Sequence, residues 1–169
     1  MKKLARWILY LLGGIAALAG LMVVIGLFVS PDVEAAVSID IASPPERVWE
    51  MVAEMENLPR WSSEISSAEQ IGENPKRYRV SGAGGDAEYE IISAEPPRRL
   101  VARMTSSSFN VTGNWDLAIE PAGQGSRIRV RMKMNIGNPL FRFFSLFMDV
   151  GEQERKTLES LKAYLEKGT

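Results

Sequence analysis

The chain has 169 residues, with 20 Lys and Arg against 21 Asp and Glu, and it contains neither Cys nor His. Without Cys, disulfides and thiolate metal sites are excluded, and without His the Ser-His-Asp and Cys-His mechanisms are excluded. Three basic residues precede residue 31, so the rest of the chain carries a formal charge of about −4. Since phosphate binding requires a basic surface, we expect no nucleic-acid partner. The sequence predicts no cofactor and no metal site.

Residues 7–31 form an uncharged stretch dominated by Leu, Ile, Val, Ala and Gly. About 23 to 25 helical residues span about 35 Å, which is enough to cross a hydrocarbon core of about 30 Å. Basic residues precede this stretch and acidic residues follow it, so the positive-inside rule places the N-terminus in the cytosol. We expect residues 1–31 to be a transmembrane anchor and residues 32–169 to be a domain on the extracytoplasmic side of the cytoplasmic membrane.

Two further interpretations of this stretch remain open. The small residues before Ala36 suit cleavage of a signal peptide, but the apolar region is longer than the usual 7 to 15 residues of such a signal, which favours a retained anchor. In addition, Gly13, Ala16, Ala17 and Gly20 place small residues on one helix face. This spacing is compatible with a weak homodimer formed through the anchor.

The first elements after the anchor follow clear patterns. Alternating apolar and polar side chains over residues 37–42 predict a half-buried strand. Ser43 is predicted to be the N-cap of a helix that has prolines in its first turn and Glu46 in the capping-box position. Residues 57–61 predict a second short helical turn. We therefore expect one strand followed by two short helices.

The middle of the chain is dominated by strand patterns after a polar connection at residues 62–72. Strands are predicted at residues 77–80, 88–91, 100–104, 114–120 and 127–136. The last strand carries a basic stripe on its outer face, consisting of Arg127, Arg129, Arg131 and Lys133. Such a stripe is typical of a solvated sheet face, which Asp116 and Glu120 on the preceding strand can neutralise; the alternative is attraction of anionic lipid headgroups.

The chain ends in a helical region that opens at Asn138. Its first part, residues 140–148, is rich in aromatic and other apolar side chains, and its second part has an apolar stripe at Leu158, Leu161 and Leu165. The first part is expected to pack on the sheet. The alternative is that it contacts the bilayer beside the anchor and gives a lipid a short path into the domain. The layout as a whole is α+β, with one sheet packed on a C-terminal helix.

Several segments resemble the SRPBCC superfamily of START-related proteins, and the chain looks most like its polyketide cyclase/dehydrase branch. The resemblance is carried by residues 43–49 (Ser-Pro-Pro-Glu-Arg-Val-Trp), by residues 57–61 (Asn-Leu-Pro-Arg-Trp) and by residues 158–162 (Leu-Glu-Ser-Leu-Lys). It extends over about residues 33–167. It implies a helix-grip fold, in which a curved antiparallel sheet of six to seven strands surrounds the C-terminal helix and encloses a cavity for a lipid, sterol, polyketide or other apolar molecule.

The side chains that suit such a cavity are large, flexible or aromatic. The ligand-binding candidates are Trp61, Tyr78, Tyr89, Met104, Trp115, Met132, Met134 and Phe144; Trp49, Met51, Met55 and Met148 are weaker candidates. The alternative for every one of them is an ordinary core position. An enzyme would also need a general acid or base in the cavity. The candidates for that role are Asp86, Glu88, Asp116, Tyr78 and Tyr89, but strand alternation directs Glu88 and Asp116 outward, so we assign no catalytic residue.

Three functions remain after these exclusions. The sequence favours a non-catalytic, membrane-anchored domain that binds a lipid or another apolar small molecule. A cyclase-type or dehydrase-type enzyme acting on an apolar substrate is the first alternative, and a membrane-tethered scaffold is the second. A wholly apolar cavity would favour binding, a buried ionisable group in the cavity would favour chemistry, and a filled core would favour the scaffold.

Overall fold

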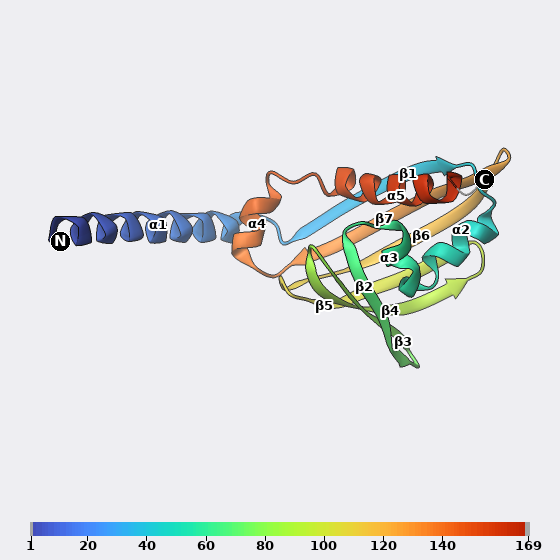
Figure 1. Cartoon of the computed structure of the whole chain (residues 1–169), viewed down its shortest axis with the longest axis horizontal. Helices are drawn as coiled ribbons and strands as arrows, with labels where there is room; N and C mark the ends of the chain where they lie inside the picture. Colours follow the sequence, from blue (N-terminus) through green and yellow to red (C-terminus); the bar gives the residue numbers. More distant parts are fainter. Residues whose placement is uncertain (1, 168–169) are drawn as a thin grey trace.

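The computed structural model describes residues 2–167, in which a long N-terminal helix projects from an α+β part (Figure 1). The helices are α1 (Lys2–Phe28), α2 (Pro45–Val52), the short 3-10 helix η1 (Met55–Asn57), α3 (Leu58–Trp61), α4 (Pro139–Ser145) and α5 (Val150–Glu166). The strands are β1 (Asp32–Ile41), β2 (Ile65–Glu73), β3 (Lys76–Gly82), β4 (Gly85–Glu95), β5 (Arg99–Ser107), β6 (Val111–Ala122) and β7 (Gly125–Ile136). The α+β part is defined here as residues 32–167.

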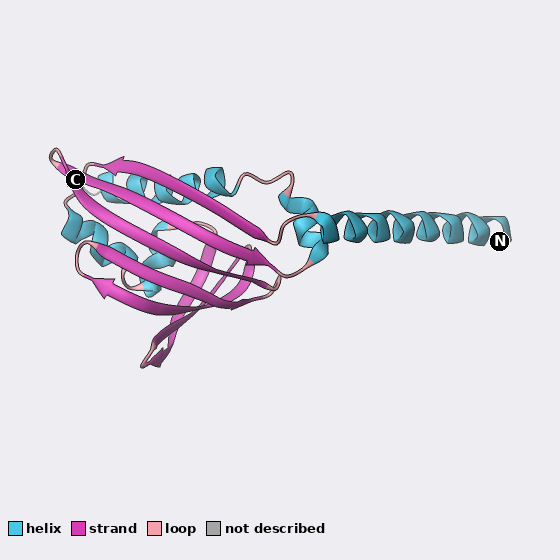
Figure 2. Cartoon of the chain, turned by 180° about the vertical axis from the view of Figure 1, so that it is seen from behind, coloured by secondary structure: helices cyan, strands magenta, loops and turns pink. Residues whose placement is uncertain are grey.

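Within these residues the strands form one seven-stranded antiparallel sheet with the order β1-β7-β6-β5-β4-β3-β2 (Figure 2). The sheet is curved, and α5 lies against its inner face. Alternation on β7 sends Ile128, Val130 and Met132 inward, where they are almost completely buried. They pack with Leu158 and Leu161 of α5 in the main core cluster. The predicted α+β helix-grip fold is confirmed.

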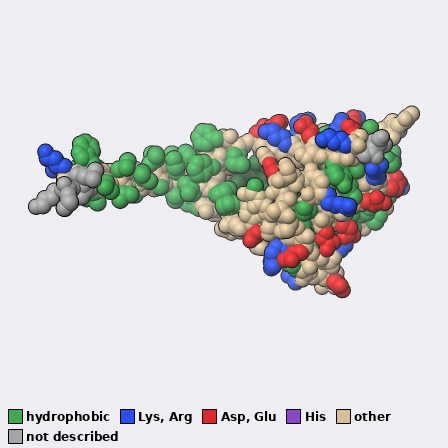
Figure 3. Space-filling model, in the orientation of Figure 1, with side chains coloured by type: hydrophobic (Ala, Val, Ile, Leu, Met, Phe, Trp, Pro, Cys, Tyr) green, Lys and Arg blue, Asp and Glu red, His purple; other side chains and the backbone are tan. Residues whose placement is uncertain are grey.

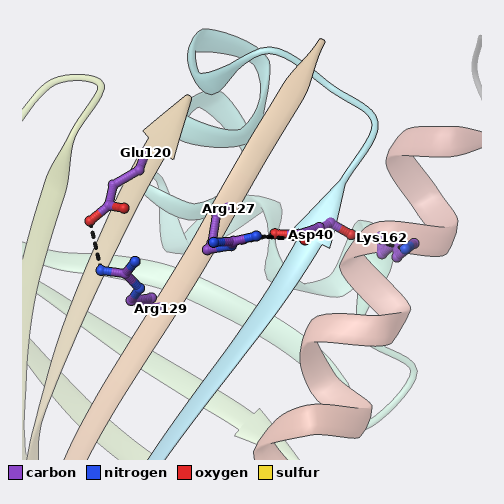
Figure 4. Close-up of polar contacts among 5 residues, drawn as sticks. All are labelled: Asp40, Glu120, Arg127, Arg129 and Lys162. Carbon is purple, nitrogen blue, oxygen red and sulfur yellow. Dashed lines mark hydrogen bonds and ion pairs between the residues drawn. The ribbon is translucent and has the colours of Figure 1, made fainter. Parts of the chain in front are cut away.

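The outer face of the sheet carries the predicted basic stripe, in which Arg127, Arg129 and Lys133 pair with acidic neighbours; Figure 4 shows the first two pairs. Arg127 makes two hydrogen bonds of 2.7 and 3.0 Å to Asp40 on β1, and Arg129 makes one of 3.0 Å to Glu120 on β6. The hydrogen bond from Arg127 lowers the pKa of Asp40. Lys162 of α5 donates to the backbone carbonyl of Asp40 at 2.9 Å, which ties the helix to the open edge of β1. The stripe is therefore a paired, solvated sheet face.

Two local predictions are wrong. Residues 65–73 form the edge strand β2 and not a polar connection; neither face of this strand is continuously buried and its pairing with β3 has two register shifts, so it lacks a regular apolar alternation. Ser43 does not cap α2, because the N-cap residue of this helix is Pro44 and no side chain makes a capping hydrogen bond there. The side chain of Ser43 is instead buried, and its backbone carbonyl accepts a hydrogen bond of 2.7 Å from Ser126.

Helix α1 is long and apolar enough to cross a membrane, over Arg6–Phe28, and none of this stretch is covered by the rest of the chain apart from its last turns. Those turns lie beside α4 (Figure 1). The connection from α1 to β1 is short, and the amide of Ile136 donates a hydrogen bond of 2.8 Å to the carbonyl of Pro31 in it. The base of α1 is thus held against the end of β7 and against α4.

Candidate functional site

A cavity of about 260 Å³ lies between α5, the α3–β2 corner and the inner face of the sheet. This volume is just below the range of about 300 to 1,000 Å³ that small-molecule pockets usually have. Most of the lining is apolar, and it includes Met55, Leu58, Ile65, Val80, Leu100, Leu117 and Leu161. The space between α5 and the sheet is therefore not completely filled, whereas the scaffold alternative predicts a filled core.

Three of the aromatic residues singled out in the sequence, Trp61, Tyr89 and Trp115, line this cavity. The indole of Trp61 is fixed by a hydrogen bond of 3.2 Å from its Nε1 to the carbonyl of Met51. The rings of Tyr89 on β4 and Trp115 on β6 meet edge to face, with centroids 5.8 Å apart. Two strands and one short helix therefore bring rigid aromatic surfaces to the same apolar space.

The cavity also contains a carboxyl group, that of Glu154 on α5. Burial raises the pKa of Glu154 to about 7, and an opposing hydrogen-bonding interaction with the Trp115 side chain limits the shift. Burial, with a smaller contribution from the nearby Glu154 charge, raises the pKa of Tyr89 to about 12. The cavity is thus not wholly apolar: its lining includes the carboxyl of Glu154, which changes protonation near neutral pH, and the phenol of Tyr89, which stays protonated, while the second lining carboxyl, that of Glu64, is exposed.

Sequence reasoning missed Glu154, although a signal for it exists. Glu154 lies four residues before Leu158 and seven before Leu161, so it shares their apolar face. A carboxylate on the buried face of a helix is unusual and marks a candidate functional group.

Polar residues also border the cavity. Gln153 of α5 donates a hydrogen bond of 2.8 Å to the carboxylate of Glu64, which precedes β2, and both side chains are exposed. Thr157 lines the cavity, but its hydroxyl donates to the carbonyl of Gln153 at 3.2 Å. Glu154 is therefore the lining side chain best suited to hydrogen bond a polar group of a ligand.

The other five ligand-binding candidates lie outside this cavity. Tyr78 is fully buried in a second core cluster, and its hydroxyl donates to Glu54 at 2.8 Å. Met132 belongs to the main core beneath α5. Met104 and Met134 border a separate and more polar groove of about 430 Å³, whose other side chains mostly belong to the outer face of the sheet. Phe144 lies on α4 and is 44% exposed. Alternation predicts which strand residues point inward, but not which of them the helices leave uncovered.

The acid and base candidates named from the sequence are also placed elsewhere. Asp86 is exposed at the start of β4. Glu88 accepts a hydrogen bond of 3.1 Å from Arg79, and Asp116 accepts two of 2.8 Å from Arg99, all on the outer face of the sheet as alternation predicts. Of the named candidates only Tyr89 reaches the cavity. Among residues 2–167, no group of three or more acidic side chains is arranged to hold a metal ion.

Comparison with known proteins supports the fold and the family. Residues 32–166 match the model of a protein family described as polyketide cyclase/dehydrase and lipid transport. A START superfamily protein from Mycobacterium smegmatis superimposes with a TM-score of 0.67 at 14% identity, over 80% of this chain and 99% of that one. The di-domain ARO/CYC protein StfQ of the steffimycin biosynthetic pathway gives a TM-score of 0.63 at 12% identity, over 80% of this chain and 52% of that one. At these identities the two structures show a shared fold alone.

A relative is also found by sequence. An uncharacterised protein of Mycobacterium tuberculosis is 27% identical over 109 residues. The match covers 60% of this chain, and it spans about 65% of the length of that relative.

Proposed function

Because the chain belongs to the polyketide cyclase/dehydrase and lipid transport family, we propose that its cavity binds a lipid or another apolar small molecule that carries one polar group. The observation that carries this proposal is the mainly apolar cavity of about 260 Å³ with the buried carboxyl of Glu154 in its lining beside aromatic rings. The apolar side chains supply the driving force for binding, since they remove the ligand's hydrocarbon surface from water. Glu154 supplies a preferred position for the polar group.

The chemistry of that polar group follows from the protonation of Glu154. With a pKa of about 7, the carboxyl is largely protonated in mildly acidic conditions and then donates a hydrogen bond to a carbonyl or ether oxygen. In its ionised form it accepts a hydrogen bond from a hydroxyl group. A ligand carboxylate is disfavoured, because two like charges would share an apolar space. The preferred ligand class is thus a neutral alcohol, ester or ketone with a hydrocarbon body.

The cellular arrangement is part of the same proposal. Residues 1–31 are the membrane anchor with the N-terminus in the cytosol, and residues 32–169 are the ligand-binding domain on the extracytoplasmic side of the cytoplasmic membrane. The length and apolar character of α1 support this arrangement, together with the basic residues before it. The chain lacks Cys, so Lys3→Cys and Lys156→Cys can be labelled one at a time with a membrane-impermeant maleimide on intact cells. Labelling at position 156 alone supports the orientation, and labelling at position 3 alone contradicts it.

The binding proposal is tested by photoaffinity labelling of the full chain in nanodiscs with a diazirine-bearing fatty alcohol. We expect label on the peptides that contain residues 58–65 and 154–161, and we expect excess dodecanol to displace it better than dodecane does. Glu154→Leu should remove the preference for dodecanol. Thr157→Phe, which places a ring in the cavity, should abolish this labelling, whereas Lys156→Phe on the exposed side of α5 should not. Label confined to α1 would contradict the proposal.

A second function is favoured by the same carboxyl. A general base with a pKa near 7 is well matched to neutral conditions, so Glu154 has the properties needed to remove a proton next to a substrate carbonyl. This is the first step of an aldol-type cyclisation. A poly-β-ketone thioester surrogate distinguishes the two functions. An enzyme would form a cyclised product at least about 100-fold faster than the Glu154→Gln variant does, while a binding protein would bind the surrogate without accelerating its cyclisation.

A further inference from the structure

An apolar surface patch lies next to the base of α1. It consists of Phe144, Leu146, Phe147 and Met148, at the end of α4 and in the segment before α5, with exposed fractions of 44%, 55%, 76% and 57%. Four large apolar side chains gathered within five residues are unusual on a surface that faces water. In the space-filling view, the hydrophobic colouring of α1 continues onto the adjoining end of the α+β part, while most of the charged side chains of that part lie farther from α1 (Figure 3).

The patch sits on a firmly held element. Arg142, the basic residue of α4, donates hydrogen bonds to the carbonyls of Ile136 at 2.7 Å and Gly137 at 3.3 Å. The side chain of Asn138 caps the start of α4 by accepting a hydrogen bond from the amide of Leu140 at 2.9 Å. Phe141 stacks on Phe109 of the β5–β6 turn, with centroids 4.6 Å apart. The guanidinium of Arg142 is thereby hydrogen bonded to the protein backbone, and these contacts fix the orientation of α4, which carries Phe144 and leads into the rest of the patch.

Helix α4 also touches α1 directly. A Cβ atom added at Gly26 would overlap the backbone carbonyl of Pro139, so the two backbones meet at this glycine. With the hydrogen bond between Pro31 and Ile136, this contact sets the direction in which α1 leaves the α+β part. The patch therefore has a defined position along the axis of α1.

That position along α1 corresponds to the surface of a membrane that α1 would cross. Trp7 is an exposed aromatic residue near the basic N-terminal end of α1, and such side chains favour the membrane interface. The 19 steps from Trp7 to Gly26 rise about 29 Å. A hydrocarbon core is about 30 Å thick, so Gly26 lies where the core ends on the opposite side. An element that packs on Gly26 lies at the lipid headgroup level of that leaflet.

We propose that the α4 patch inserts into the outer leaflet of the same membrane that α1 crosses, as a second lipid contact beside the anchor. The inference rests on the proposed function in that it requires α1 to span the bilayer. It goes beyond that function because it fixes how the cavity faces the membrane. α5 begins two residues after Met148, and Glu154 lies one turn into it. The carboxyl of the cavity is then close to the lipid surface, and an apolar molecule has a short path between bilayer and cavity.

The test uses the full chain in nanodiscs of phosphatidylcholine and phosphatidylglycerol, with nitroxide labels at single introduced cysteines. Leu146→Cys reports on the patch, and Met148→Cys provides a second position. Leu18→Cys reports on the middle of α1, and Lys156→Cys reports on an exposed position of α5. Collision rates with oxygen, which concentrates in lipid, and with a water-soluble nickel chelate give the depth of each label.

We expect the ratio of oxygen to nickel accessibility to be at least about 5-fold higher at positions 146 and 148 than at position 156, and highest at position 18. A lipid-exposed label at position 18 with water-exposed labels at positions 146 and 148 would overturn the inference and leave the anchor intact. A water-exposed label at position 18 would overturn both. Shielding of positions 146 and 148 from both reagents would assign the patch to a protein contact, such as a second copy of the chain, and would also overturn the inference.

Discussion

Gln153 of α5 donates a hydrogen bond of 2.8 Å to Glu64, and this contact joins the first turn of α5 to the residue that leads into β2. The two residues are 89 positions apart in the sequence. Glu64 lines the cavity, and Gln153 is the immediate neighbour of Glu154. The hydrogen bond therefore closes the gap between the C-terminal helix and the edge of the sheet beside the candidate site.

Removing this hydrogen bond should loosen the border of the cavity without unfolding the protein. Gln153→Ala leaves the exposed carboxylate of Glu64 free to bind water, so we expect little change in thermal stability. We expect amide hydrogen exchange in β2 and in the first turn of α5 to become about 3-fold to 10-fold faster, because local opening requires one contact fewer. Gln124→Ala, in the exposed β6–β7 turn, is the matched control. Unchanged exchange in both segments would show that the contact does not hold them together.

The raised pKa of Glu154 should make stability depend on pH. The unfolded chain releases this proton near the ordinary value of 4.5, while the folded chain holds it up to about 7. The contribution of Glu154 to the free energy of unfolding is therefore most favourable below pH 4.5, and it decreases by about 3 kcal/mol as the pH rises to 7 and above. Glu154→Gln should remove this component of the pH dependence.

Thermal unfolding of the full chain between pH 4.5 and 8 measures this component. Other carboxyls contribute to the same profile with the opposite sign, among them Glu54, whose pKa is lowered by its hydrogen bond with Lys76. The comparison must therefore be made between variants. Glu152→Gln, in the exposed first turn of α5, is the control and should keep the wild-type profile. Identical profiles for Glu154→Gln and the wild type would show that the carboxyl is well solvated.

The framework of the fold could be predicted because it depends on local patterns. The alternation on β7 identifies its inner face, and the Leu158, Leu161 and Leu165 stripe identifies the face of α5 that packs on the sheet. The predicted strands at residues 77–80 and 88–91 are present as parts of β3 and β4, and Arg79 and Glu88 pair across them. The sequence did not predict β2, because neither face of this edge strand is continuously buried and its residues therefore show no regular alternation of apolar and polar side chains.

The candidate site was less predictable because it depends on how elements meet. Tyr78 and Tyr89 look equivalent in their strands, yet Tyr78 is covered by core residues while Tyr89 borders the cavity. Phe144 looks like a core residue, but α4 ends at Ser145 and a separate helix, capped by Asp149, carries the chain back over the sheet. Whether a side chain fills the core or borders a cavity depends on the position of α5 and α3, which no local pattern encodes.

The contact between α5 and the sheet should dominate stability. Leu161 is fully buried and packs in the main core cluster, so Leu161→Ala is expected to reduce the free energy of unfolding by about 2 to 5 kcal/mol. Glu159→Ala, on the exposed side of the same helix, should change it by less than about 0.5 kcal/mol. Denaturant unfolding of the full chain, followed by near-ultraviolet circular dichroism, measures both. Similar values for the two variants would contradict the packing of α5 on the sheet.

The central claim is that the cavity holds an apolar molecule, and native mass spectrometry of the full chain released from detergent micelles tests it most directly. We predict that the wild-type chain and the Lys156→Phe variant carry a co-purified or added neutral lipid of defined mass at about one molecule per chain. We predict that Thr157→Phe carries much less, because its added ring occupies the cavity. Equal occupancy in Thr157→Phe and the wild type, or no bound molecule in either after dodecanol is added, would contradict the account.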